Sequence, residues 1–203
     1  MRVFVAVELP AELRERMATV QDRLKNAGAE ASWTRPGGIH LTLKFLGEVA
    51  EEQVPQIMRA LATASSEKGR FRLGAEGVGT FPNASSARVV WIGVTGDVGR
   101  LVELQAAVEQ ALAALGFEPE GRPYTPHLTL GRIRRIRKRD AWLKALEVFR
   151  TFKLPDFDVA SVSLISSELK PGGAVYRELG SVALRDEPGQ PLPSPQPSEG
   201  PPQ

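Results

Sequence analysis

His40-Leu-Thr-Leu43 returns unchanged as His127-Leu-Thr-Leu130, and these two stretches contain both histidines of the 203-residue chain. Ordinary residue usage would place Leu-Thr-Leu after a given histidine on the order of once in a thousand times or less, so the repeat carries information. Side chains of a β-strand alternate between its two faces, so the histidine and the threonine of each motif share one face. The two leucines point to the opposite face, where we expect the hydrophobic core.

The elements predicted around the two motifs follow the same order in both halves of the chain. Corresponding elements are offset by about 85 to 88 residues. The first half is predicted to contain a strand over 2–8, a helix from Pro10 to about Asn26, a strand over 39–46, a helix over 51–68 and a strand over 71–81. The second half is predicted to contain a strand over 88–94, a helix capped by Asp97 and ending near Gly116, a strand over 127–132, a helix over 139–149 and strands around 159–165 and 175–184.

This repetition predicts an ancient duplication and one bilobal α+β domain over residues 1–185. Its lobes are expected to be built from pseudo-repeats of about 1–82 and 86–184, related by a pseudo-twofold axis. Matching strands would then meet at the interface, where ligand sites often form. Residues 186–203 are rich in Pro, Ser, Gln and Gly, which predicts a disordered tail. The alternative for the tail is a docking segment for a proline-binding partner, through Pro191-Leu-Pro-Ser-Pro195.

Composition limits the class of protein. The chain has no cysteine, so disulfides, thiolate metal sites and a thiol nucleophile are excluded. No apolar run reaches the roughly 18 residues of a membrane span, and the N-terminus reads as a strand and not as a signal peptide. Because three of the 24 acidic residues and none of the 26 basic ones follow residue 185, the net charge of +2 rises to +5 for residues 1–185. We expect a cytoplasmic monomer with no membrane association and an anionic partner.

Two imidazoles and two hydroxyls converging on one cleft suit phosphodiester chemistry. A neutral imidazole can take a proton from water, an imidazolium can give one to a departing oxygen, and hydroxyls can bind phosphate oxygens. The pKa of histidine, about 6.5, allows both protonation states near neutrality. One alternative is that both histidines are structural. A second is a metal site, which would need further ligands that the composition does not offer as His or Cys.

The two motifs and their surroundings resemble a known family. Paired His-x-Thr-x motifs some 80–90 residues apart are typical of the 2H phosphoesterases. The surrounding sequence resembles the branch of RNA 2′,3′-cyclic phosphodiesterases, also described as 2′-5′ RNA ligases. Three stretches carry the resemblance, which spans about residues 1–184: Met1 to Pro10, Trp33-Thr-Arg-Pro-Gly-Gly-Ile-His-Leu-Thr-Leu-Lys-Phe-Leu-Gly-Glu48, and Pro123-Tyr-Thr-Pro-His-Leu-Thr-Leu-Gly-Arg132.

The resemblance implies a bilobal duplicated α+β fold, with two antiparallel sheets lining a central cleft and helices outside. It implies metal-independent hydrolysis of a terminal RNA 2′,3′-cyclic phosphate to a 2′-phosphomonoester, with no cofactor and with tRNA fragments as one source of substrate. It also implies that His40 is the proton donor, that His127 is the proton acceptor, and that Thr42 and Thr129 hold the phosphate. The symmetric motifs alone do not assign these roles. Alternative activities are cleavage of 2′-5′ linkages, 2′-5′ RNA ligation, and non-catalytic binding of RNA ends.

Four further residues are candidate substrate contacts. Phe45 falls at i+5 from His40, which favours the core in a regular strand, with base stacking as the alternative. Arg132 falls at i+5 from His127 and would point away from the cleft unless a bulge redirects it to bind phosphate. Tyr124 is either a base-stacking residue or a plain loop aromatic, and Arg35 is the fourth candidate. Six of the eight residues over 132–139 are basic, which indicates either an RNA-binding segment or a solvated loop.

Overall fold

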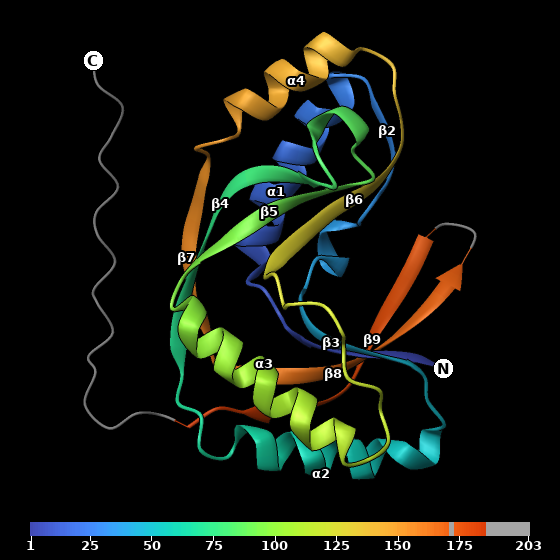
Figure 1. Ribbon diagram of the computed structural model, residues 1–203, viewed down its shortest axis with the longest axis vertical. Coiled ribbons are helices and arrows are strands. Elements are labelled where there is room, and N and C mark those ends of the chain that lie inside the picture. Colours follow the sequence, from blue (N-terminus) through green and yellow to red (C-terminus); the bar gives the residue numbers. More distant parts are fainter. Residues whose placement is uncertain (171–172, 186–203) are drawn as a thin grey trace.

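The computed structural model describes residues 1–170 and 173–185, which form two antiparallel sheets with helices packed around them (Figure 1). The predicted tail lies outside the described residues. The strands are β1 (Arg2–Val7), β2 (Ala29–Trp33), β3 (Leu41–Glu48), β4 (Phe71–Phe81), β5 (Val89–Gly96), β6 (His127–Ile136), β7 (Lys153–Val159), β8 (Ser161–Lys170) and β9 (Gly173–Ala183). The helices are α1 (Ala11–Asn26), α2 (Val54–Ser65), α3 (Val98–Ala113) and α4 (Arg139–Val148), with the short 3-10 turns η1 (Pro36–Gly38), η2 (Glu51–Gln53) and η3 (Ala84–Ser86).

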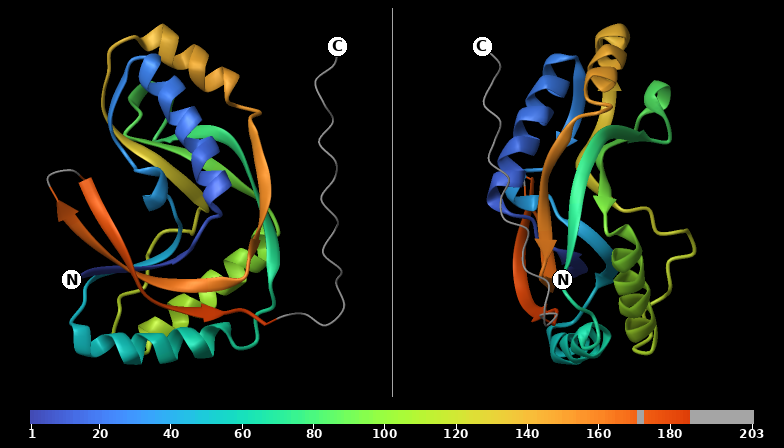
Figure 2. Two further views of the ribbon diagram at one scale, coloured as in Figure 1. Left: turned by 180° about the vertical axis from the view of Figure 1, so that it is seen from behind. Right: turned by 90° about the vertical axis from the view of Figure 1, so that its left-hand side faces the viewer.

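The two sheets divide the motif strands between them. One sheet has four strands in the order β3-β1-β8-β9, and the other has five in the order β2-β6-β5-β4-β7. The helices α2 and α3 pack against each other beside the four-stranded sheet, whereas α1 and α4 lie together at the other end of the molecule (Figures 1 and 2). The first motif strand, β3, therefore belongs to the four-stranded sheet, and the second, β6, belongs to the five-stranded sheet.

The strand order of the two sheets reveals the duplication. The runs β3-β1-β8 and β6-β5-β4 are equivalent: each joins the motif strand and first strand of one half to a strand from the late part of the other half. The strand β8 of the second half thus pairs with β1 of the first half, and β4 of the first half pairs with β5 of the second. Both sheets therefore take strands from both halves of the chain.

The helices form where apolar residues recur at helical spacing. Along α3, Leu101, Leu104, Val108 and Leu112 are fully buried, at the i, i+3, i+7 and i+11 positions of one face. Asp97 occupies the N-cap position of α3 as predicted, but its side chain makes no capping bond. Its Oδ2 instead accepts a hydrogen bond from the backbone N–H of Arg72, at 3.3 Å. No helix in the described part of the chain is long and apolar enough to cross a membrane.

The sequence did not predict β2 and β7, which are the two edge strands of the five-stranded sheet. The strands β2 and β7 each pair with only one neighbour, so half of their backbone groups face outward. Edge strands tolerate proline and charge, and β7 contains Pro155 and Asp156. Their sequences therefore lack the apolar alternation by which strands are recognised. The strand β6 is also longer than predicted, because its basic end pairs with β2 up to Ile136.

Candidate active site

The motif strands orient their side chains as the alternation predicts. The four motif leucines, Leu41, Leu43, Leu128 and Leu130, are at most 3% exposed and belong to the main core cluster. Thr42 and Thr129 instead line a cavity of about 1330 Å³ together with His127, Phe45, Tyr124 and Arg132. The structure thus gathers six of the eight predicted site residues at one cavity between the two motif strands.

A β-bulge interrupts each motif strand at the same place. In β3, Val5 of β1 faces Lys44 while Ala6 faces Thr42, so Leu43 is an extra residue. In β6 the pairing with β5 skips Leu130 in the same way. A bulge shifts the alternation of side chains by one residue. Leu43 and Lys44 are consequently both buried, and so are Leu130 and Gly131.

The bulges decide where Phe45 and Arg132 point. Phe45 was expected in the core, but it lines the cavity and is 71% exposed. The core placement is wrong because the prediction assumed a strand without a bulge. Arg132 reaches the same cavity through the matching bulge, as the alternative for this residue required.

His127 lies at the start of β6, and one of its two ring nitrogens makes a hydrogen bond to the backbone. Its Nδ1 lies 2.7 Å from the carbonyl oxygen of Thr125. A carbonyl oxygen only accepts hydrogen bonds, so Nδ1 carries the hydrogen and a neutral ring leaves Nε2 unprotonated. The rings of Phe81 and Trp91 make edge contacts with this imidazole, at centroid distances of 5.2 and 6.4 Å. Sequence reasoning did not single out these two aromatic residues as parts of the site.

His40 lies just before β3 and is far more enclosed, with 8% of the residue exposed. Its ring makes edge contacts with Phe4 and Tyr176, at centroid distances of 5.5 and 5.1 Å. Burial, with a smaller contribution from the positive charge of Arg14, lowers the pKa of His40 to about 4, against an opposing backbone hydrogen bond with Gly38. At neutral pH the ring of the unliganded protein is therefore uncharged.

Two charged residues that the sequence did not single out belong to the surroundings of His40. Glu8 Oε1 lies 3.9 Å from His40 Nε2, and the second oxygen of Glu8 lies 3.5 Å from Arg14 Nη2. Glu8 directly follows β1, and Arg14 lies in the first turn of α1. Both residues are therefore distant from the motif in sequence. The adjacent Tyr176 comes from β9; burial raises its pKa, while Arg132 acts to lower it.

A buried polar network supports the cavity wall between β3 and α3. Lys44 Nζ lies 2.6 Å from Glu109 Oε2 and donates a hydrogen bond to the Glu118 carbonyl. The Lys44 side chain is only 3% exposed. Gln105 donates to Glu109 and to the carbonyl of Leu43, the bulged residue. These contacts hold the bulge and the segment before the second motif in one arrangement.

Tyr124 connects the two halves of the site. Its hydroxyl donates a hydrogen bond to the Thr42 carbonyl at 3.0 Å, and burial raises its pKa well above the usual value. Arg35, in contrast, is an exposed residue at the start of η1 and is not among the residues that line the cavity. Within residues 1–170 and 173–185, no group of three or more His, Cys, Asp or Glu side chains is arranged to hold a metal ion.

Comparison with known proteins agrees with the duplicated architecture of the chain. Two successive copies of the LigT-like phosphoesterase family match residues 7–91 and 92–176. The chain belongs to this family. It is 35% identical over 178 residues to an RNA 2′,3′-cyclic phosphodiesterase of Methanothermobacter thermautotrophicus, covering 88% of this chain and 96% of that protein. It is 34% identical over 197 residues to one of Thermus thermophilus, covering 94% and 93%.

Two solved structures share the fold. A Thermus thermophilus protein superposes with a TM-score of 0.74 at 28% identity, covering 92% of this chain and all of that one. Escherichia coli LigT complexed with 3′-AMP superposes with a TM-score of 0.69 at 27% identity, covering 90% and 97%. The fold predicted from the resemblance is therefore confirmed: two antiparallel sheets, duplicated, with helices around them.

Proposed function

We propose that this LigT-like phosphoesterase hydrolyses the 2′,3′-cyclic phosphate at the end of an RNA to a 2′-phosphomonoester. The observation that carries the proposal is the pair of identical motifs on equivalent bulged strands, whose threonines line one cavity with His127. The relatives named RNA 2′,3′-cyclic phosphodiesterase support the reaction, and the 3′-AMP complex of LigT supports nucleotide binding. We expect RNA to be the partner, with tRNA fragments as one source, and a cytoplasmic monomer as the active form.

In this proposal His127 activates the attacking water. Its Nδ1–H is held by the Thr125 carbonyl, so the neutral ring directs the lone pair of Nε2 outward. Nε2 takes a proton from water while the oxygen of that water bonds to phosphorus. Such orientation of a base by a fixed hydrogen bond on its second nitrogen is a general device of histidine catalysis.

His40 is then the proton donor. As the bond from phosphorus to O3′ breaks, His40 gives its proton to O3′, and the 2′-phosphomonoester is left. The donor must be protonated, whereas the pKa of about 4 makes it neutral in the free protein. A bound phosphodiester brings a negative charge next to the ring, which raises the pKa of an imidazole. The substrate itself therefore charges the donor, and exchange with solvent restores both rings after each turnover.

The remaining cavity residues bind the substrate. The hydroxyls of Thr42 and Thr129, which line the cavity, donate hydrogen bonds to non-bridging phosphate oxygens in this proposal. Phe45 offers an exposed ring for stacking on the terminal base, and Arg132 offers a guanidinium for phosphate or base contact. Tyr124, which bonds the Thr42 backbone, serves as a positioning residue for that threonine.

Hydrolysis of adenosine 2′,3′-cyclic phosphate in excess EDTA, with the 2′- and 3′-phosphate products resolved, tests the reaction. The proposal predicts EDTA-resistant release of the 2′-phosphate alone. A 3′-phosphate product would place the departing oxygen at O2′ and contradict the mechanism. Absence of turnover, together with tight binding of RNA ends, would favour the non-catalytic alternative.

A further inference from the structure

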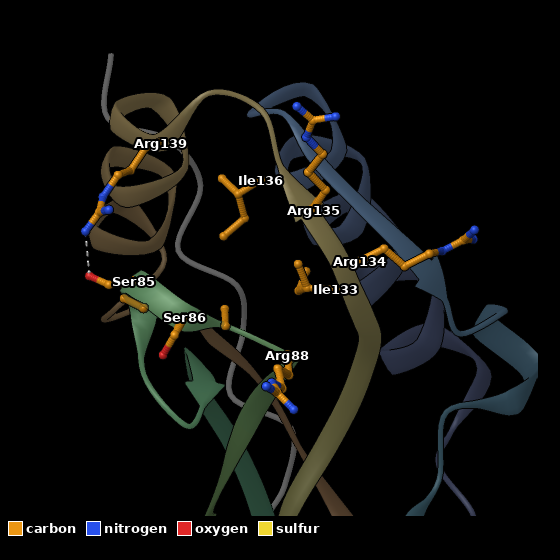
Figure 3. A pocket seen from close by; sticks show the side chains of 10 residues that line it. Ser85, Ser86, Arg88, Ile133, Arg134, Arg135, Ile136 and Arg139 are labelled. Carbon is orange, nitrogen blue, oxygen red and sulfur yellow. Dashed lines mark hydrogen bonds between the residues drawn. The ribbon is translucent and has the colours of Figure 1, made fainter.

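A second pocket, of about 500 Å³, lies between η3, the end of β6 and the start of α4 (Figure 3). Isoleucine side chains of β6 point into the space between these elements, Arg139 reaches towards Ser85, and Arg134 extends away on the β2 side. None of the described residues that line the pocket is acidic. Its polar lining consists of Ser85, Ser86, Arg88, Arg134, Arg135 and Arg139.

The serine side of this pocket is held in place by hydrogen bonds. Asn83 Oδ1 accepts hydrogen bonds from the backbone N–H groups of Ser85 and Ser86 and from the Ser86 hydroxyl. Trp142 of α4 donates from Nε1 to the Ala84 carbonyl at 3.2 Å. Arg139 Nη2 donates to the Ser85 hydroxyl at 3.1 Å. The pocket is thus arranged before any ligand enters, which reduces the entropy lost on binding.

Within residues 1–170 and 173–185, the arginines that line the pocket form no ion pair with a carboxylate. Among the described residues, no carboxylate lies within ion-pair distance of Arg88, Arg134 or Arg135. The neighbouring Glu30 of β2 is engaged by Arg137, and Asp140 follows Arg139 on α4. Guanidinium groups without acidic partners beside serine hydroxyls favour a phosphate ligand, because both groups donate hydrogen bonds to phosphate oxygens.

The pocket continues the catalytic cavity along two paired strands. Val89 and Arg132 are partners in the β5–β6 register, and both line the cavity. Their chain neighbours Arg88 and Ile133 line the pocket and are joined by a backbone hydrogen bond of 2.8 Å. The strand from Arg132 to Ile136 rises about 13 Å, a distance that a few nucleotides can bridge. A chain leaving the cavity along β6 therefore arrives at this pocket.

We propose that this pocket binds the backbone of the RNA substrate a few nucleotides upstream of the cyclic end. Arg88 and Arg139 contact a phosphate there, and the exposed edges of Ile133 and Ile136 support the attached nucleoside. Arg134 and Arg135 add positive potential beside the path. This inference rests on the proposed function for the identity of the RNA end, but it assigns the pocket to a part of the substrate that the chemical step does not touch.

The test compares a substrate that reaches the pocket with one that does not. Adenosine 2′,3′-cyclic phosphate fills only the cavity, whereas a hexanucleotide ending in a cyclic phosphate also has upstream phosphates. The double variant Arg88→Gln/Arg139→Gln should raise KM for the hexanucleotide at least tenfold and leave kcat/KM for the mononucleotide within twofold. The slope of log KM against log salt should fall by about 0.7 for each phosphate that the double variant no longer binds.

Two matched variants separate this site from general effects. Arg59→Gln removes one exposed positive charge from α2, at the other end of the molecule, and should leave both substrates unaffected. Ser85→Ala removes the hydrogen bond of Arg139 without changing charge, and should change KM for the hexanucleotide less than threefold. Equal losses in the double variant and in Arg59→Gln, or equal losses on both substrates, would overturn the proposal.

Failure of the proposed hydrolysis can be distinguished from failure of the proposed RNA-binding pocket. Wild-type protein that turned over neither substrate would contradict the hydrolysis and not the pocket. Fluorescence anisotropy with the labelled hexanucleotide would then still measure binding. A Kd that the double variant does not weaken would overturn the RNA-binding assignment.

Discussion

Phe45 and Arg132 occupy equivalent positions in the two halves of the protein. Each follows the histidine of its motif by five residues, and each is turned into the cavity by a bulge at the last leucine of the tetrapeptide. One half therefore presents an aromatic ring, and the other a guanidinium, at matching places around the site. The duplication supplies two matching histidine motifs, while Phe45 and Arg132 make the lining of the cavity asymmetric.

Replacing Phe45 by alanine should impair substrate binding and leave folding intact. Stacking of a base on an aromatic ring contributes about 1–3 kcal/mol, so kcat/KM for adenosine 2′,3′-cyclic phosphate should fall about tenfold or more. Because Phe45 is 71% exposed, the free energy of unfolding should change by less than about 0.5 kcal/mol. Val148→Ala, at a residue that is 66% exposed on α4, is the matched control. An unchanged kcat/KM in Phe45→Ala would exclude stacking.

Breaking the buried pair of Lys44 and Glu109 in the cavity wall should strongly destabilise the protein. Lys44→Ala leaves the Glu109 carboxylate, only 17% exposed, without its cation. Removing one partner of a buried pair typically costs about 3–5 kcal/mol. Urea unfolding should therefore show a large loss for Lys44→Ala and a smaller one for Lys44→Ala combined with Glu109→Ala. A double variant as unstable as the sum of the two single variants would mean that the pair is not coupled.

Burial of His40 predicts that the protein loses stability in acid. Its pKa of about 4 in the folded state lies below the ordinary value of 6.5, so the unfolded chain takes up the proton first as pH falls. The stabilising contribution is present above pH 6.5 and is lost as pH falls towards 4. At about 1.36 kcal/mol per pKa unit, the loss is on the order of 3 kcal/mol. Urea unfolding of His40→Gln across this range should lack that component of the pH dependence.

Substrate binding should shift the pH dependence of the reaction. The profile of kcat/KM reports groups of the free enzyme, and that of kcat reports groups of the complex. If the bound phosphate raises the pKa of His40, the donor stays protonated to higher pH in the complex. The alkaline limb of kcat should therefore lie at higher pH than that of kcat/KM. Coincident limbs would contradict charging of the donor by the substrate.

The sequence predicted the parts of this protein that depend on local pattern. The motif leucines, alternating with polar residues, indicated which face of each strand is buried, and the matching order of elements indicated the duplication. The edge strands β2 and β7 lack that pattern, because an edge strand is buried by fewer neighbours. The sequences of β3 and β6 alone do not predict the bulges, because a bulge is defined by how a strand pairs with its neighbour.

The residues that surround His40 and His127 were less predictable, because they come from distant parts of the sequence. Glu8 lies just after β1, Arg14 in α1 and Tyr176 in β9, and no spacing in the sequence relates these residues to His40. One signal was available: Phe4 and Trp91 are 87 residues apart, as are the two histidines, and each packs against the histidine of its own half.

The central claim is that His40 and His127 act together on one phosphodiester. Its most direct test is kcat for adenosine 2′,3′-cyclic phosphate in His40→Ala, His127→Ala and the double variant, with circular dichroism confirming that each is folded. A positioned acid or base typically contributes about 10²–10⁴-fold, so each single variant should lose that much. Groups that act as a unit are not additive, so the double variant should lose little more than the more impaired single variant. A folded single variant that retains kcat within tenfold of the wild type would contradict the two-histidine mechanism.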